Sequence, residues 1–198
     1  MKQRAGLALY AVVRAIVVGF CKTFWRLSVE GREHVPASGS FVLAPVHRSN
    51  IDFAVVAAVT RRRMRYMGKD TLWKMRWFGA FISALGAFPV HRGAADREAL
   101  RIVHETFADG EVVSIFITGH RQRELTGAKD GAGMLAVVEG VTVIPAAIRG
   151  SGGWRPGRRV RVSFGPPRTY ARDGRRGRDA YRAAAQDLVE EIGRLYGD

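Results

Sequence analysis

The sequence is poor in cysteine, in acidic residues and in long apolar stretches free of charge. It contains one cysteine in 198 residues, so no intrachain disulfide can form and no zinc cluster can be built from thiolates. Asp and Glu together number 18 against 32 Lys and Arg, which leaves a formal net charge of +14. This charge favours anionic partners, which include nucleic acid, anionic lipid and phosphate-bearing small molecules.

The remaining composition is typical of a globular protein with a packed core. Hydrophobic residues make up 47% of the chain and charged residues 25%, a balance that excludes a disordered chain. The length suggests one domain with a small appendage. We expect an N-terminal membrane-interface helical segment over residues 1–27. An α/β domain over residues 28–198, ending in an amphipathic helix, is expected to follow it.

The N-terminal segment over residues 5–27 is largely apolar but carries charges. A membrane-spanning helix needs about 20 apolar residues with few charges, so a spanning helix is not expected. Four basic residues fall within roughly a 120° sector of the helical wheel: Arg4, Arg14, Lys22 and Arg26. The rest of the wheel is apolar, a pattern typical of a helix that lies in the membrane interface. A buried core helix and a secretory signal peptide are the alternatives.

Apolar runs predict the strands of a central sheet. The longer runs cover residues 41–46, 112–117, 141–148 and 160–164, and shorter runs cover 64–67 and 88–90. Helical patterns lie between or after them, at residues 51–59, 71–85, 95–107, 131–139 and 181–196. This alternation predicts an α/β fold with a mixed, mostly parallel central sheet flanked by helices. The N-terminal interfacial membrane helix, or helical pair, precedes that sheet.

The first candidate site is the segment 46–52, which follows an apolar strand and opens a helix. Ligands of α/β sheets bind beyond the carboxyl ends of strands, and His47 is at such an end. Asp52 is expected in the first turn of the helix. There its carboxylate can accept a hydrogen bond from one ring nitrogen of His47 and leave the other nitrogen free as a base. Taken alone, a His near an Asp is also a common structural pair.

Basic residues occur in loops after two further strands and downstream of them. They are Arg92, Arg121 and Lys129, with Gly119 in the second loop. Basic loops at several strand ends converge on one rim of a sheet, which predicts a phosphate-binding pocket. A fourth segment of interest, an apolar strand, contains Pro145, which by default marks an edge strand or a kink.

In this order and spacing, the four segments resemble the glycerolipid acyltransferase family, the 1-acylglycerol-3-phosphate (PlsC-type) acyltransferases. The family's hallmark of His, four residues and Asp matches His47 and Asp52. Its second motif, an apolar strand that ends in an arginine, matches residues 88–92. Its third motif usually reads Phe-Pro-Glu-Gly-Thr-Arg and matches 116–121, and its fourth, an apolar strand with a proline, matches 143–148.

The resemblance implies an enzyme that moves a fatty acyl group from acyl-CoA or acyl-carrier protein to the free hydroxyl of lysophosphatidic acid, giving phosphatidic acid. It implies His47 as the general base and Asp52 as its orienting partner, with no covalent acyl-enzyme, no metal and no cofactor. By motif position, the substrate-binding residues are Arg92, Gly119, Arg121 and Lys129. The expected location is the cytoplasmic face of the cell membrane, where the protein is peripheral or monotopic.

The third motif departs from the family pattern, with Ile117 in place of Pro, Thr118 in place of Glu and His120 in place of Thr. Thr118 can form hydrogen bonds but supplies no negative charge. Losing a charged hydrogen bond costs on the order of 1.5–3 kcal/mol. The alternatives are therefore transfer to another lysolipid or glycolipid acceptor, or a catalytically weakened relative that binds anionic membranes.

Nucleic-acid binding is a third class of function, suggested by the charge and by the basic runs 61–63 and 175–178. The sequence shows no helix-turn-helix, RNA-recognition or zinc-finger pattern, so we expect no nucleic-acid partner. An anionic membrane leaflet attracts basic residues as well as nucleic acid does. The basic run 61–63, together with Lys74, Trp73 and Trp77, is either part of a membrane-facing surface or a solvated helix face with core tryptophans.

Overall fold

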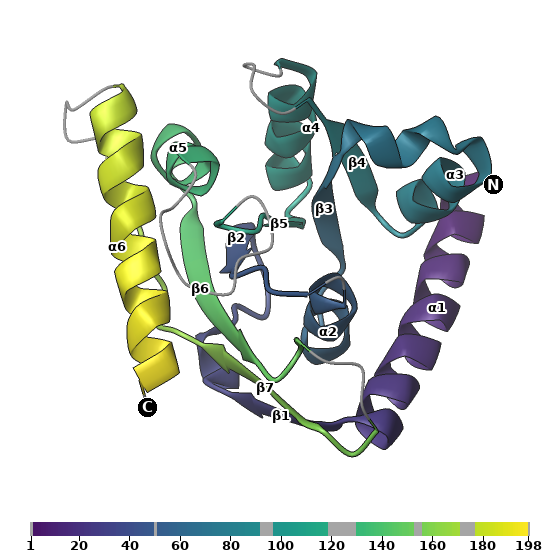
Figure 1. The fold of residues 1–198 in the computed structure, drawn as a ribbon. Coiled ribbons are helices and arrows are strands. Elements are labelled where there is room, and N and C mark those ends of the chain that lie inside the picture. The colour runs from purple at the N-terminus through teal and green to yellow at the C-terminus, as the bar shows by residue number, and fades with distance from the viewer. Residues whose placement is uncertain are drawn as a thin grey trace.

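A central sheet organises the computed structural model, which describes residues 2–49, 51–91, 97–118, 130–152, 156–170 and 177–197. Within these ranges the sheet has seven strands in the order β1-β7-β6-β2-β5-β3-β4 (Figure 1). The strands are β1 (Arg26–Glu30), β2 (Phe41–Pro45), β3 (Met64–Lys69), β4 (Ala87–Val90), β5 (Val112–Ser114), β6 (Thr142–Arg149) and β7 (Arg159–Phe164). Only the β6–β7 pair is antiparallel. The predicted mixed, mostly parallel sheet is confirmed.

Helices cover both faces of the sheet. They are α1 (Lys2–Phe24), α2 (Asp52–Val59), α3 (Arg76–Ala84), α4 (Arg97–Ala108), α5 (Asp130–Glu139) and α6 (Arg178–Gly197), with short 3-10 helices η1 (Arg32–His34) and η2 (Asp70–Lys74). Side chains of α1 and α2 pack into one core cluster, and those of α4, α5 and α6 pack into a second. The predicted α/β architecture with flanking helices is therefore confirmed.

The central strand β2 belongs to both clusters. Successive side chains of a strand point to opposite faces, so Phe41 and Leu43 join the cluster with α2. Val42 and Ala44 join the cluster with α5 and α6. A strand covered on both faces needs apolar residues at every position, which explains the unbroken apolar run there. Because β2 is packed on both faces, its carboxyl end and the start of the loop that follows are held in place at the edge of the sheet.

Strand β1 was not predicted from the sequence. It alternates exposed and half-buried residues at the edge of the sheet, and only Leu27 and Val29 are apolar. Its partner is β7, with Arg26 paired to Arg159. This pairing joins residues more than 130 positions apart, so no local pattern could indicate it. The predicted helix over 71–85 is also wrong in part, because extended backbone at Met75 divides it into η2 and α3.

Pro145 lies in an interior strand, so the expectation of an edge strand is wrong. The register pairs Ala146 with Phe164, the last residue of β7. Pro145 therefore faces Gly165, whose N–H donates to the Pro145 carbonyl at 2.9 Å. Pro145 has no N–H to return that bond, and the β6–β7 ladder stops there. On the other side β6 remains paired with β2 through Ala44.

The helix predicted at the N-terminus is present, but two residues of its predicted basic stripe, Arg14 and Arg26, are placed elsewhere. Arg26 belongs to β1, and Arg14 turns inward, where its guanidinium donates to the carbonyl of Thr60 at the end of α2. The outward face of α1 is apolar instead: Leu9, Val12, Ile16 and Phe20 are 40%, 58%, 65% and 38% exposed. Among the described residues, no helix has the length and apolar character needed to cross a membrane.

Helices α5 and α6 approach each other closely at Gly133. A Cβ atom at this position would lie 2.0 Å from the backbone carbonyl oxygen of Tyr181 and 2.8 Å from the backbone nitrogen of Ala185. We expect Gly133→Ala to lower the free energy of unfolding by about 1–3 kcal/mol, because α6 must shift to relieve the overlap. Chemical denaturation measures this change.

Gly19→Ala on α1 is the matched control, because a Cβ there would meet no atom within 4 Å. Alanine is the better helix former, so this variant should be neutral or slightly stabilising. A Gly133→Ala protein at least as stable as the parent would contradict the expected clash.

Candidate active site

The His47 loop lies at the carboxyl edge of the sheet. Strand β2 ends at Pro45 and α2 begins at Asp52, so the loop between them is short. Strands β6, β5, β3 and β4 run in the same direction as β2, and their carboxyl ends lie at this same edge. Such an edge is where α/β proteins bind ligands.

One carboxylate oxygen of Asp52 accepts three hydrogen bonds from the His47 loop. Its Oδ2 accepts hydrogen bonds from Nδ1 of His47 at 2.9 Å and from the backbone N–H groups of Arg48 and Ser49 at 2.6 Å each. The Asp52 side chain is fully buried, and it lies in the first turn of α2. The amino end of a helix favours a negative charge, so the fold stabilises a carboxylate at this place.

The contact with Asp52 determines which nitrogen of His47 carries the proton. A carboxylate only accepts hydrogen bonds, so the proton of a neutral ring is on Nδ1, and Nε2 retains its lone pair. The His47 side chain is 19% exposed, which leaves the ring within reach of a ligand. In this arrangement Nε2 could accept a proton from a hydroxyl group bound beside it.

The start of the third motif packs against His47. The ring of Phe116 stacks on the imidazole, with centroids 4.2 Å apart and planes at 26°. The segment after β5 continues alongside β2, where N–H groups of Ile115 and Ile117 donate to the carbonyls of Leu43 and Pro45 at 3.0 Å each. Thr118, the residue in place of the usual Glu, follows directly and is 1% exposed.

All four predicted substrate-binding residues lie outside the described residues: Arg92, Gly119, Arg121 and Lys129. Strand β4 ends at Val90, two residues before Arg92, and the described segment after β5 reaches Thr118. In the chain, Arg92, Gly119 and Arg121 therefore follow segments that end at the carboxyl edge of the sheet, where His47 also lies.

Three residues beside this loop were not predicted from the sequence: Arg48, Arg149 and Tyr196. Arg149 ends β6, and the guanidinium groups of both arginines lie over the Tyr196 ring. Arg149, like Arg92, is a basic residue that follows an apolar run, so the criterion that indicated Arg92 could also have indicated Arg149. Tyr196 carried no signal, because it is the last residue of an amphipathic pattern and resembles an ordinary helix residue.

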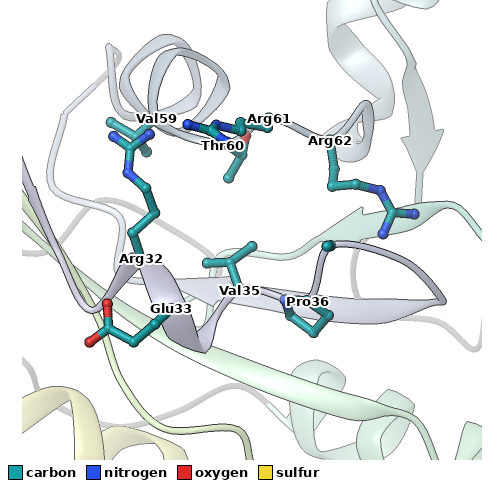
Figure 2. Close-up of a pocket in the computed structure, with 9 residues that line it drawn as sticks. Arg32, Glu33, Val35, Pro36, Val59, Thr60, Arg61 and Arg62 are labelled. Atoms are coloured by element: carbon teal, nitrogen blue, oxygen red, sulfur yellow. The ribbon is translucent and has the colours of Figure 1, made fainter.

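Two surface hollows are lined by residues other than His47. One, of about 390 Å³, is at the end of α2 (Figure 2), and its lining residues are Arg32, Glu33, Val35, Pro36, Ala37, Val59, Thr60, Arg61 and Arg62. In Figure 2, Arg32 extends toward the end of α2 and Glu33 points away from it. Because His47 precedes α2 and Thr60 follows it, this hollow is at the opposite edge of the sheet.

The second hollow, of about 410 Å³, adjoins the end of α1. It is lined by Lys22, Arg26, Leu27, Ser28, Arg159 and Arg161, so most of its residues are basic. Among the described residues, no three His, Cys, Asp or Glu side chains form a group able to hold a metal ion. In the basic run 61–63, the Arg62 guanidinium donates to the backbone carbonyls of Gly39 and Gly110.

Comparisons with known proteins find relatives among acyltransferases. A 1-acyl-sn-glycerol-3-phosphate acyltransferase of Bacillus subtilis is 30% identical over 125 residues, which cover 63% of each chain. A chloroplastic 1-acyl-sn-glycerol-3-phosphate acyltransferase of Arabidopsis thaliana is 25% identical over 134 residues, which cover 65% of this chain and 37% of the plant protein. The chain thus spans less than two thirds of the length of each of these relatives.

The fold is also that of a solved acyltransferase. The crystal structure of the 1-acyl-sn-glycerophosphate acyltransferase PlsC from Thermotoga maritima matches with a TM-score of 0.72 and 22% sequence identity, over 96% of this chain and 82% of that chain. The profile of the family described as Acyltransferase matches residues 26–149, more than half of the chain. This protein therefore belongs to the acyltransferase family.

Proposed function

We propose that the protein transfers a fatty acyl group from acyl-CoA, or from an acyl-carrier protein, to the free hydroxyl of lysophosphatidic acid, giving phosphatidic acid. The hydrogen bond between Nδ1 of His47 and Oδ2 of Asp52 carries this proposal, because it leaves Nε2 as a base at the ligand-binding edge. The two relatives named as 1-acyl-sn-glycerol-3-phosphate acyltransferases support the choice of substrate.

In the proposed reaction Nε2 of His47 takes the proton of the acceptor hydroxyl as its oxygen attacks the thioester carbonyl carbon. The C–O bond forms, the C–S bond breaks, and the departing sulfur receives the proton from the imidazolium. Asp52 orients the ring and stabilises its positive form. Phe116, stacked on the ring, limits its rotation. The acyl group passes directly between the substrates, without an acyl-enzyme.

The acceptor phosphate is assigned to the loops after β4 and β5. By motif position Arg92 and Arg121 bind it, with Gly119 in the same loop as Arg121 and Lys129 as a further cation. The parallel course of β2, β5, β3 and β4 supports this assignment, because their carboxyl ends share one edge. An arginine fork suits a phosphate group because it donates two parallel hydrogen bonds.

A second candidate keeps the reaction and changes the acceptor to another lysolipid or a glycolipid. Thr118 favours it, because the family usually has Glu at this position and Thr118 is buried directly after the segment that contacts His47. A buried threonine cannot balance a neighbouring cation or bind an acceptor hydroxyl with a full negative charge. The acceptor is the substrate that such a change affects most directly.

An anionic membrane surface is the proposed partner of α1, with the protein peripheral or monotopic on the cytoplasmic face. A helix whose outward face is apolar and whose arginine turns inward suits an apolar environment. Helix α1 contacts α3 (Figure 1). That neighbouring region also exposes large apolar side chains: Leu72, Met75, Trp77 and Phe81.

Basic residues near the end of α1 support the same orientation. Lys22, Arg26 and Arg159 line a shared hollow, and each Lys or Arg near an anionic leaflet contributes roughly 1 kcal/mol. Trp77 is 69% exposed, so its alternative role as a core tryptophan is wrong. An exposed tryptophan is common at the level of lipid headgroups.

Ile16→Glu is expected to weaken binding to vesicles of phosphatidylglycerol and phosphatidylcholine by about 10-fold or more. Burying an Ile side chain contributes about 1.5–3 kcal/mol, and a carboxylate is repelled by the anionic leaflet. Co-sedimentation with vesicles measures the loss. Ala183→Glu, which adds the same charge at an exposed position of α6, is the control. Equal binding by both variants would contradict docking through α1.

The proposed reaction is tested by incubating the purified protein with palmitoyl-CoA and lysophosphatidic acid in vesicles. Mass spectrometry then detects phosphatidic acid. A parallel panel of other lysolipids and of glycolipids separates the two candidate acceptors, since the preferred acceptor gives the higher kcat/KM. Absence of product with every acceptor, from a folded protein, would sink the proposed function.

A further inference from the structure

Two arginines and a tyrosine from distant parts of the chain meet on the β6 side of the His47 loop. Arg48 follows His47, Arg149 is the last residue of β6, and Tyr196 lies in the last turn of α6. The Cζ atom of Arg48 is 4.4 Å from the centre of the Tyr196 ring, and that of Arg149 is 5.5 Å from it. We refer to these three residues as the Arg48–Tyr196–Arg149 cluster.

The aromatic ring of this cluster is held firmly in place. The Tyr196 hydroxyl donates to the carbonyl of Ile148 at 2.7 Å and accepts from the N–H of Ile148 at 3.2 Å. The guanidinium of Arg149 donates to the carbonyl of Leu195. Burial raises the pKa of the Tyr196 hydroxyl, so the ring is neutral and does not cancel the charge of either arginine.

Both cations of the cluster lack an acidic partner among the residues that the structure describes. Within the described ranges, neither Arg48 nor Arg149 forms an ion pair, whereas Arg63 pairs with Glu111, and Arg168 pairs with Asp187 and Glu191. The Nε atom of Arg48 is buried without a hydrogen-bond partner among these residues. Two like charges held over one ring repel each other, and an anion bound between them removes this repulsion.

The position of the cluster indicates which anion it binds. In the sheet order, β6 lies on one side of β2, while β5, β3 and β4 lie on the other. The proposed acceptor ligands Arg92 and Arg121 follow β4 and β5 in the chain. Arg48 and Arg149 lie on the β6 side instead. Two anionic substrates that react at His47 must approach it by different routes, so the second basic cluster suits the donor.

The chemistry of the two substrates supports the same division. In lysophosphatidic acid only a few covalent bonds separate the phosphate from the reacting hydroxyl. In the donor, the whole pantetheine arm separates its phosphate from the thioester. The Arg48 side chain leaves the His47 loop and ends over Tyr196 of α6, which suits a phosphate remote from the reacting carbon.

We propose that the Arg48–Tyr196–Arg149 cluster binds the phosphate at the end of the acyl donor's pantetheine arm. Acyl-CoA and acyl-carrier protein share this group. Arg48 and Arg149 bind the phosphate, and Tyr196 is a positioning residue that holds both guanidinium groups. The proposal rests on the proposed acyl transfer, which it refines by assigning the donor side of the same site.

Arg149→Gln is expected to raise the KM for palmitoyl-CoA by about 10- to 100-fold, the effect of losing one charged hydrogen bond. The KM for lysophosphatidic acid should not change. Palmitoyl-pantetheine, which has the thioester but no phosphate, should react with the parent and with Arg149→Gln at the same KM. Arg48→Gln should show the same division, because its backbone N–H still donates to Asp52.

Three further variants separate binding from general effects of charge and packing. Arg182→Gln removes the same charge from an exposed position of α6 and should match the parent. Tyr196→Phe keeps the ring and should raise the KM for palmitoyl-CoA only slightly. Tyr196→Leu removes the ring and should behave like Arg149→Gln, with the KM for palmitoyl-pantetheine unchanged.

Several outcomes would overturn the assignment. An unchanged KM for palmitoyl-CoA in Arg149→Gln would overturn it, as would an increase in the KM for lysophosphatidic acid instead. Palmitoyl-acyl-carrier protein should show the same increase as palmitoyl-CoA. An increase restricted to palmitoyl-CoA would assign the cluster to the phosphates of the nucleotide and would overturn its assignment to the arm.

Calorimetric titration with coenzyme A tests the cluster separately from the reaction. If the parent forms no phosphatidic acid, the proposed function fails, but weaker binding of coenzyme A by Arg149→Gln than by Arg182→Gln would still support the cluster. Equal binding of coenzyme A by these two variants would overturn the cluster even if the parent is active.

Discussion

His47→Ala is expected to lower the rate of phosphatidic acid formation by about 10²- to 10⁴-fold, the usual contribution of a positioned general base. The variant removes Nε2, which is proposed to take the hydroxyl proton. It leaves Asp52 with its two backbone donors, Arg48 and Ser49, so the loop should keep its shape. The measurement is product formation by mass spectrometry with saturating palmitoyl-CoA and lysophosphatidic acid.

His104→Ala is the matched control. His104 lies on α4, is 75% exposed and pairs with Glu139, so its loss removes an imidazole without touching the site. Equal rates for the parent and His47→Ala would contradict the assignment of the base. Vesicle binding by both proteins without turnover by either would support the alternative of a relative that binds anionic membranes.

The His47–Asp52 geometry was accessible from the sequence because it depends on local structure alone. A buried strand, a short loop and the first turn of a helix fix the separation of two residues five positions apart, and the observed Nδ1–Oδ2 distance is 2.9 Å. The apolar runs likewise indicated β2, β5 and β6, because buried strands are apolar at most positions. Strand β7 was indicated instead by apolar residues that alternate with polar ones.

The features that sequence reasoning missed depend on contacts between distant residues. Strand β1 has no apolar run because it lies at the sheet edge, and its partner β7 is far away in the chain. The helical wheel of α1 gave the correct helix, but a wheel does not show which side faces the protein. The contact of Arg14 with the carbonyl of Thr60 shows that the Arg14 side of α1 faces the protein. The contact of Tyr196 with β6 depends on how α6 packs against the sheet, which no local pattern indicates.

Asp52→Asn is expected to lower the rate by about 10⁴-fold, the effect seen when the acid of a catalytic triad is changed in this way. The amide is nearly the same shape as the carboxylate, so the fully buried side chain still fits. It cannot balance the positive charge that His47 gains on taking the proton. If its NH₂ group turns toward Nδ1, the ring proton moves to Nε2 and the base is lost. Steady-state kinetics measures the fall in kcat.

Asp52→Ala should show that the same oxygen also supports the fold. Removing Oδ2 leaves the Nδ1–H of His47 and the backbone N–H groups of Arg48 and Ser49 without their acceptor. Each unsatisfied buried donor costs about 1–3 kcal/mol, so the free energy of unfolding should fall well below that of Asp52→Asn. Equal stability of the two variants would mean that water replaces the carboxylate in the loop. Among the described residues Asp52 is the one carboxylate in contact with Nδ1 of His47. Full activity of Asp52→Asn would therefore mean that the ring needs no carboxylate partner for catalysis.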